Sequence, residues 1–149
     1  IIKSCKIKSE IVNKDEKEKN LRMILNFGHT FAHGFESAKN FSKKLNHGEA
    51  VLLGMFVASE LSFNKKILNS KELFFIKKHY SALGLLSNIK KLFKNKEINK
   101  IVHFMQKDKK NFNEKINLIL LKKIGITTKP KTISLKAKDI MLFLRSYYR

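Results

Sequence analysis

The sequence LRMILNFGHTFAHGFE, residues 21–36, is the stretch from which the fold is most readily inferred. If residues 20–38 form a helix that turns about 100° per residue, the side chains of Arg22, Asn26, His29 and His33 lie within roughly 60° of one another. The remaining faces are apolar, so we expect the helix to bury its polar line as well. Buried polar groups cost several kcal/mol without partners, and a metal ion with an anionic, hydroxyl-rich substrate would provide them.

The histidine spacing has a second interpretation. Two histidines four residues apart, such as His29 and His33, are often an ordinary hydrogen-bonded pair in a core. The polar neighbours on the same line favour a binding site instead, and so does His47, which begins the next apolar segment (HGEAV) and can face this line across a turn. Imidazoles from two adjacent helices together with a carboxylate are typical of a catalytic zinc site. Two histidines alone are too few, so the spacing by itself leaves both interpretations open.

The rest of the sequence predicts a mainly α-helical domain with one small β-hairpin. Further helices are predicted at 1–12, 48–63, 70–84, 96–109 and 136–147, with a charged break at 13–19 and a polar connection at 39–46. The segment 48–63 is apolar on nearly every side, so it should be buried. Ser70 is expected to cap a helix that stops at Gly84, a residue suited to the position after a helix end. Two short strands, 116–121 and 125–128, are predicted to form the hairpin.

Composition indicates one folded domain over residues 1–149. Hydrophobic residues make up 43% of the chain, which is enough for one core and too many for a disordered protein. No apolar run is long enough to span a membrane. The single cysteine, Cys5, excludes an intrachain disulfide and is typical of a reducing cytoplasm. The sequence starts at Ile1 without a methionine or a signal-peptide pattern, so we expect a fragment or an internal start.

The formal net charge of +20 at pH 7 raises the question of nucleic-acid binding. The lysines are spread along the chain and do not gather in one patch, and the abundant Lys, Asn, Ile and Phe residues share A/T-rich codons. The phenylalanines fall at helical spacing with aliphatic residues, which predicts core packing and not a basic, aromatic binding face. We therefore favour a solvated lysine-rich surface. A module that binds nucleic acid or an acidic partner is the alternative.

The two histidine motifs resemble the signature of 3-dehydroquinate synthases, LNFGHTFGHAIE followed by LHGEAVAIGM. Here they read LNFGHTFAHGFE and LNHGEAVLLGM. Upstream, KSEIV and DEKE precede LR as they do in the family, and downstream MQKDKK resembles the family pattern M-x-x-D-K-K. The resemblance runs in order along nearly the whole chain. It implies that residues 1–149 are the helical C-terminal domain of such an enzyme, which binds metal and substrate.

The resemblance also implies roles for individual residues. By this likeness His29 and His47 bind zinc (or cobalt). The position of His33 lines the active site in the family and assists proton transfer. Arg22 and Asn26 match residues that contact the substrate. The histidine pair of the first motif is thereby divided between metal binding and proton transfer.

Three further positions follow from the same likeness. Lys8 matches a lysine that binds the substrate phosphate or carboxylate, and Glu18 matches an active-site acid. Lys109 is implied as a substrate contact, with Lys110 as the alternative. The family takes its third zinc ligand, a glutamate, and a catalytic lysine from a segment that precedes residue 1 of this chain. Those two roles are assigned to no residue here.

The activity that the resemblance implies is the conversion of 3-deoxy-D-arabino-heptulosonate 7-phosphate to 3-dehydroquinate and phosphate. This is a carbon–oxygen lyase reaction of the shikimate pathway, which leads to chorismate and the aromatic amino acids, and it uses NAD catalytically. The implied partners are a sugar phosphate substrate, an α/β nucleotide-binding N-terminal domain and a second copy in a cytoplasmic homodimer. NAD would be bound mainly by that N-terminal domain, so the chain alone is expected to be inactive. Alternatives are a sister sugar-phosphate cyclase, a non-catalytic basic helical module, and a remnant of a split gene.

Overall fold

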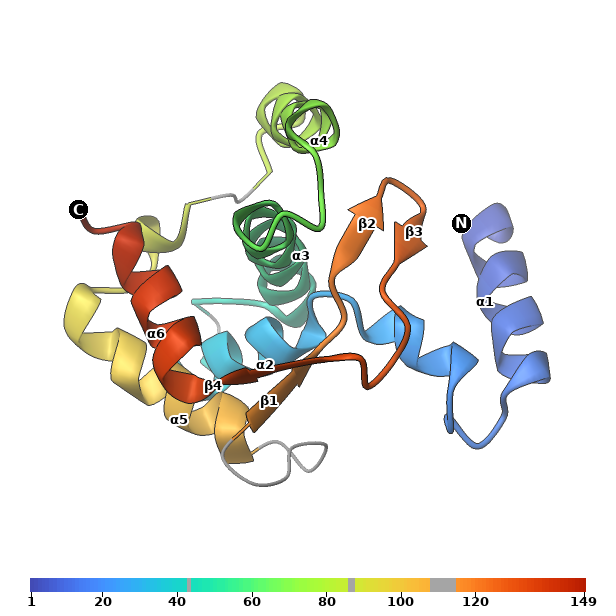
Figure 1. Cartoon of the computed structure of the whole chain (residues 1–149), viewed down its shortest axis with the longest axis horizontal. Coiled ribbons are helices and arrows are strands. Elements are labelled where there is room, and N and C mark those ends of the chain that lie inside the picture. The colour runs from blue at the N-terminus through green and yellow to red at the C-terminus, as the bar shows by residue number, and fades with distance from the viewer. Residues whose placement is uncertain (43, 86–87, 108–114) are drawn as a thin grey trace.

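The computed structural model describes residues 1–42, 44–85, 88–107 and 115–149, and Figure 1 shows how its elements are arranged. The prediction of a mainly helical fold with a small antiparallel hairpin is confirmed. The α-helices are α1 (Ile2–Lys14), α2 (His29–Ala38), α3 (His47–Asn64), α4 (Ser70–Ala82), α5 (Ile98–Lys107) and α6 (Ala137–Ser146). The 3₁₀ helices are η1 (Leu21–Asn26), η2 (Ile89–Lys91) and η3 (Asn95–Glu97), and the strands are β1 (Lys115–Leu118), β2 (Leu121–Lys123), β3 (Ile126–Thr127) and β4 (Ile133–Lys136). No described helix is both long and apolar enough to cross a membrane.

The core lies where α2 packs between α3 and α5, near the centre of the molecule (Figure 1). Phe31 and Phe35 of α2 are at most 1% exposed, and the ring centre of Phe35 lies 5.4 Å from that of Phe93. Burying one such side chain stabilises the fold by about 1.5–3 kcal/mol. The buried residues of α3, from Ala50 to Ser62, occur on every side of that helix, as its sequence predicts. These contacts fix the direction of the two helices that carry His29, His33 and His47.

The predicted continuous helix over residues 20–38 is wrong. Residues 21–26 form η1, and the chain then turns at Phe27 and Gly28 before α2 begins. Gly28 has a φ of 82°, a left-handed conformation that favours glycine. A Cβ at Gly28 would lie 2.6 Å from the backbone nitrogen of Met55 on α3, so close packing of the two helices requires a glycine here. The polar residues before and after the turn therefore do not share one helical face.

The predicted hairpin is partly correct. Strands β2 and β3 pair antiparallel across a turn that contains Gly125, whose φ is 85°. The predicted strand 116–121 is divided, because its first half belongs to β1, which pairs with β4 in the register Ile116 to Leu135 and Leu118 to Ile133. The sequence does not predict β4, since its four residues run directly into α6 and its partner strand is distant in the chain.

The predicted ends of the fourth helix are nearly correct. α4 begins at Ser70, but the capping residue is Asn69, whose Oδ1 accepts a hydrogen bond from the Glu72 amide at 2.9 Å. Gly84 follows the end of α4 with a φ of 60°, as expected of a glycine at this position. α5 lies inside the predicted range 96–109.

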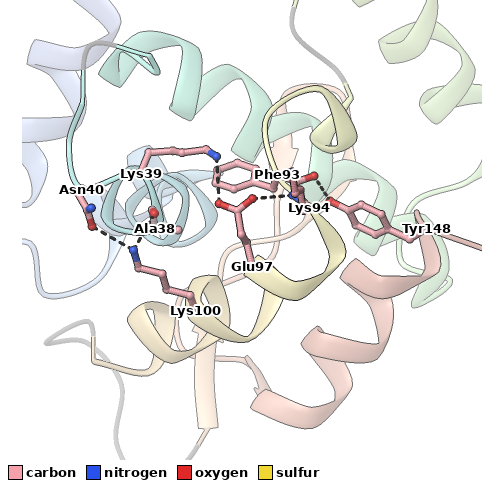
Figure 2. Close-up of polar contacts among 8 residues, drawn as sticks. All are labelled: Ala38, Lys39, Asn40, Phe93, Lys94, Glu97, Lys100 and Tyr148. Atoms are coloured by element: carbon pink, nitrogen blue, oxygen red, sulfur yellow. Dashed lines mark hydrogen bonds and ion pairs between the residues drawn. The ribbon is translucent and has the colours of Figure 1, made fainter.

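Polar contacts anchor the C-terminal end of α2 to the neighbouring segments (Figure 2). Lys39 Nζ lies 3.1 Å from Glu97 Oε1 at the end of η3. Lys100 Nζ on α5 donates to the Ala38 carbonyl at 3.0 Å and to Asn40 Oδ1 at 3.1 Å. A cation at the carbonyl end of a helix interacts favourably with its dipole. These contacts hold the far end of α2, while its first turn faces the candidate site.

α1 lies at one end of the molecule, next to η1 and away from the core (Figure 1). None of its residues is buried, and Ile2 and Ile7 are 87% and 51% exposed. This helix therefore adds little to the core. Its contribution to the site is to place Lys8 opposite η1.

Candidate functional site

A cavity of about 500 Å³ lies between α1, the loop after it, η1 and the first residue of α2. Five residues to which the family resemblance assigns a role line this cavity: Lys8, Glu18, Arg22, Asn26 and His29. Ser4, Ile7 and Leu25 complete the lining. The described chain thus gathers two cations, a carboxylate, an amide and an imidazole around a space large enough for a small, charged ligand.

Asp15 organises the loop that leads from α1 to η1. Its Oδ2 accepts from the amides of Asn20 at 2.7 Å and Arg22 at 3.0 Å, and its Oδ1 accepts from the Lys19 amide at 2.9 Å. The hydrogen bonds from the Asn20 and Lys19 amides hold the pKa of the Asp15 carboxyl below its usual value of 3.8. An ionised Asp15 therefore fixes the backbone from which the Arg22 side chain enters the cavity.

The side chains on this loop and on η1 contact one another. Asn26 Nδ2 donates to Glu18 Oε1 at 2.6 Å, and a guanidinium nitrogen of Arg22 donates to the Glu16 carbonyl at 2.8 Å. Glu18 has a φ of 51°, a left-handed conformation that costs energy for residues other than glycine and is common at functional sites. These contacts orient the amide and the guanidinium at the wall of the cavity.

Three histidines lie together at this end of α2 and α3. The ring centre of His29 is 6.0 Å from that of His33 and 6.0 Å from that of His47. His47 is the first residue of α3, and the preceding Asn46 amide donates to Glu49 Oε2 at 2.9 Å, which fixes the start of that helix. The prediction that His47 faces the histidines of α2 is confirmed by this geometry.

His47 has a carboxylate partner that the sequence did not indicate. Its Nδ1 lies 3.0 Å from Oε1 of Glu36 on α2. The Glu36 residue is 9% exposed, whereas the His47 side chain is 62% exposed. The buried side chain of this pair is therefore the carboxylate, and the accessible one is the imidazole.

The separation of the His29 and His47 rings is compatible with a shared zinc ion. Nδ1 of His29 lies 3.4 Å from the Phe27 carbonyl, and Nδ1 of His47 faces Glu36, so in the neutral rings the lone pair lies on Nε2. Two imidazoles with nitrogens about 2 Å from one tetrahedral zinc ion hold their ring centres roughly 5 Å apart, close to the 6.0 Å of this pair. The His29–His33 pair has the same separation. The choice of His47 therefore rests on the family resemblance and on its carboxylate partner.

A complete metal site needs a further ligand. Within residues 1–42, 44–85, 88–107 and 115–149, no group of three or more His, Cys, Asp or Glu side chains is arranged to hold a metal ion. A catalytic zinc ion usually has three protein ligands and one open position. The described residues therefore do not contain a complete set of three such ligands.

The expectation that the polar line is buried is wrong. Arg22, Asn26 and His29 are half-buried, and His33 and His47 are exposed. The physical reason for the first three is the turn between η1 and α2, which leaves these side chains lining a surface cavity. Arg22, Asn26 and His29 thus share one cavity although they do not lie along a single helix, whereas His33 and His47 do not line it.

Some site residues were missed by the sequence reasoning, and some lie beyond the described structure. Glu36 follows His29 by seven residues, a spacing that returns to the same side of an α-helix and could have singled it out. Asp15 follows the end of α1 directly, where aspartate commonly accepts from nearby amides. Lys109 and Lys110 lie outside the described residues.

A second cavity, of about 680 Å³, has a different character. It is lined mainly by apolar residues of η1, α4 and the β2–β3 hairpin, among them Ile24, Phe75 and Leu121, and it contains none of the predicted site residues. The charged residues that the family resemblance singles out therefore line only the smaller of these two cavities.

Comparison with known proteins identifies a family model and curated relatives. The family model described as 3-dehydroquinate synthase C-terminal matches residues 1–111. The 3-dehydroquinate synthase of Pelagibacter ubique is 50% identical over 145 residues, which make up 97% of this chain and 39% of that protein. That of Thermoanaerobacter pseudethanolicus is 38% identical over 145 residues, which make up 97% of this chain and 38% of that protein. The chain thus spans less than half the length of these curated relatives.

Solved structures share the fold. A 2-deoxy-scyllo-inosose synthase matches with a TM-score of 0.75 and 21% identity, over 93% of this chain and 37% of that one. A 2-epi-5-epi-valiolone synthase from Streptomyces hygroscopicus, with NAD+ and Zn2+ bound, matches with a TM-score of 0.70 and 22% identity, over 93% of this chain and 36% of that one. A 2-deoxy-scyllo-inosose synthase with carbaglucose-6-phosphate, NAD+ and Co2+ matches with a TM-score of 0.70 and 22% identity, over 88% of this chain and 36% of that one. At these identities the likeness shows a common fold.

Proposed function

Because the chain belongs to the family of 3-dehydroquinate synthase C-terminal domains, we propose that it supplies the metal- and substrate-binding half of a 3-dehydroquinate synthase. The reaction would convert 3-deoxy-D-arabino-heptulosonate 7-phosphate to 3-dehydroquinate and phosphate with catalytic NAD. The observation that carries this proposal is the cavity that brings Lys8, Arg22 and Asn26 beside His29. Those side chains suit a substrate that carries a carboxylate, a phosphate and several hydroxyl groups.

The cations of the cavity would hold the anionic groups of the substrate. Lys8 on α1 and Arg22 on η1 both line the cavity. Each would form charge-assisted hydrogen bonds to a carboxylate or phosphate oxygen. The Asn26 amide, which already donates to Glu18, would contact a substrate hydroxyl. We expect the role of Lys109 to be of the same kind.

The histidines would divide metal binding and proton transfer. His29 and His47 would hold zinc or cobalt, together with a ligand from outside the described residues. A bound zinc ion would polarise a substrate oxygen during hydride transfer. His33, one turn from His29 and exposed, would exchange a proton with the substrate. Glu18, which also lines the cavity, would act as an acid.

NAD, a partner domain and a second copy belong to the same proposal. The relatives are more than twice as long as the segment that matches this chain, and we expect NAD to be bound by an N-terminal domain of that longer protein. A homodimer and a cytoplasmic location stay predictions of the family likeness.

Activity measurements on the complete gene product that carries this chain test the proposal. With NAD and zinc present, 3-deoxy-D-arabino-heptulosonate 7-phosphate should yield phosphate and 3-dehydroquinate in equal amounts. Arg22→Ala should raise KM strongly, because it removes a charge that binds the substrate. A folded, zinc-loaded protein that releases no phosphate from this substrate would contradict the proposal.

A related sugar-phosphate cyclase is the second candidate, since the solved structures of that fold include such enzymes. The cavity residues suit any sugar phosphate, so their geometry does not separate the two candidates. The 50% identity to a 3-dehydroquinate synthase favours the first. Turnover of glucose 6-phosphate, whose carba analogue is bound in one of the similar structures, in preference to the heptulosonate phosphate would favour the second.

A further inference from the structure

Glu36 is a carboxylate in the middle of a helix that otherwise contributes to the core. It is 9% exposed, and its neighbours Phe35 and Ala38 are buried. At 3.6 residues per turn, Glu36 lies on the same side of α2 as His29, two turns further along. Burial of an ionised carboxylate is unfavourable unless polar partners compensate for the lost hydration. Its place in α2 therefore calls for a partner from a neighbouring element.

That partner comes from the start of α3. Oε1 of Glu36 lies 3.0 Å from Nδ1 of His47, and the exposed fractions of the two side chains are 11% and 62%. The carboxylate is fixed by the packing of α2, whereas the imidazole stands at the surface with little packing around it. The contact consequently restrains the orientation of the His47 ring more than that of the Glu36 side chain.

The contact also selects a tautomer. An ionised carboxylate only accepts hydrogen bonds, so the Nδ1 atom of His47 must carry a hydrogen when it faces Glu36. The lone pair of the neutral ring then lies on Nε2, away from Glu36. Histidines that bind metals almost always donate their other N–H to a carboxylate, a carbonyl or a water, which fixes the tautomer and the ring orientation. His47 makes such a contact with Glu36.

We propose that Glu36 is a positioning residue for His47: it holds the imidazole with Nε2 directed away from α2's carboxylate and thereby strengthens metal binding. This inference rests on the proposed function, because it takes His47 as a metal ligand. The simpler alternative is an ion pair that only ties α2 to the start of α3. Metal affinity distinguishes the positioning role from this alternative. An ion pair that only connects two helices would alter the stability of the protein without a specific effect on metal affinity.

The test measures zinc affinity by competition with a chelator in the complete gene product. Glu36→Gln keeps the size of the side chain and removes its charge, and it should weaken zinc binding by about 10- to 100-fold. The matched control is Glu97→Gln, which removes a carboxylate that pairs with Lys39 at 3.1 Å at the other end of α2. Glu97→Gln should leave zinc affinity unchanged. His47→Ala reports whether His47 is a ligand at all.

The outcomes separate this inference from the proposed function. If His47→Ala lowers zinc affinity but Glu36→Gln stays within about twofold of the unmodified protein, well short of the loss expected, the positioning role is wrong and the metal site stands. If His47→Ala has no effect, the ligand assignment fails, and the role of Glu36 fails with it. Equal losses of zinc affinity for Glu36→Gln and Glu97→Gln would favour an ion pair that only connects the helices and would overturn the positioning role.

If the Glu36→Gln protein does not fold, the proposal can still be tested in the unmodified protein. Nitrogen-15 chemical shifts of the neutral His47 ring in the metal-free protein distinguish its two tautomers. A hydrogen on Nδ1 and a lone pair on Nε2 are the expected result. A hydrogen on Nε2 would overturn the proposal.

Discussion

Gly54 of α3 faces the carbonyl oxygen of Gly28 so closely that a Cβ at Gly54 would lie 2.3 Å from that oxygen. Gly28 is the residue at which the chain turns into α2, directly before His29. The approach of these two glycines therefore sets the distance between the helices that carry the candidate metal ligands.

Gly54→Ala should destabilise the protein by roughly 1–3 kcal/mol, because the added methyl group meets backbone atoms that cannot move independently of α2. Urea denaturation measures the change. The matched control is Gly48→Ala in the same helix, where a Cβ would meet nothing within 4 Å. That variant should be neutral or more stable, since alanine favours helix over glycine. Equal stability of the two variants would contradict the close packing of α2 on α3.

Tyr147→Phe should destabilise the protein more than Tyr148→Phe. The hydroxyl of Tyr147 donates a hydrogen bond to Glu60, a carboxylate that also lies 2.7 Å from Lys77 Nζ. Hydrogen bonds to charged groups contribute about 1.5–3 kcal/mol, against about 0.5–1.5 kcal/mol for neutral ones. The Tyr148 hydroxyl donates to a neutral carbonyl, that of Phe93, at 2.7 Å. Urea denaturation of both variants gives the comparison, and a larger loss for Tyr148→Phe would contradict it.

The tyrosines should resist ionisation while the protein is folded. Burial raises the pKa of Tyr80, Tyr147 and Tyr148 above the usual 10.0, and the Glu60 charge adds to the effect at Tyr147 and the Glu97 charge at Tyr148. A raised pKa in the folded state contributes stability that is fully present below pH 10 and is lost as the pH rises through the folded-state value. Tyrosinate absorbance should therefore appear only above pH 10, together with unfolding. Three tyrosines that titrate near pH 10 with unchanged circular dichroism would contradict this expectation.

Asp15→Ala should loosen the loop that positions Arg22. The side chain accepts hydrogen bonds from the amides of Lys19, Asn20 and Arg22, and without it these amides should exchange with solvent much faster. Because the carboxyl has a lowered pKa, its contribution is present above pH 3.8 and is lost as the pH falls below that value. Hydrogen–deuterium exchange at neutral pH measures the effect. Glu16→Ala is the control, since only the backbone carbonyl of Glu16 contacts Arg22 in the described contacts.

The sequence predicts the helical part of this fold better than the details of the site. The apolar pattern of 48–63 is sufficient to predict a buried α3, because a helix without a polar face has to be surrounded by other elements. The turn at Gly28 is not visible in that way, since residues 21–26 and 29–38 have compatible helical patterns, and the close approach of Gly28 to α3 involves a distant segment. β4 is missed for a similar reason, because its pairing with β1 depends on a distant segment.

The site shows the same division between local and distant information. The single-helix argument grouped Arg22, Asn26 and His29 for a reason that the structure contradicts, while the family resemblance grouped them independently of helix geometry. Their common cavity results from the turn and from the position of α1. The contact between Glu36 and His47 joins two helices, and no pattern along one segment predicts such a contact with certainty.

The metal content of the complete gene product tests most directly whether this chain carries half of a metal site. We predict one zinc or cobalt ion per chain in the unmodified protein, and a nearly complete loss in both His29→Ala and His47→Ala at unchanged helical content. His103→Ala, at an exposed position of α5, a helix that carries none of the candidate ligands, should keep its metal. Near-normal metal content in either His29→Ala or His47→Ala would contradict the assignment of these two residues as ligands.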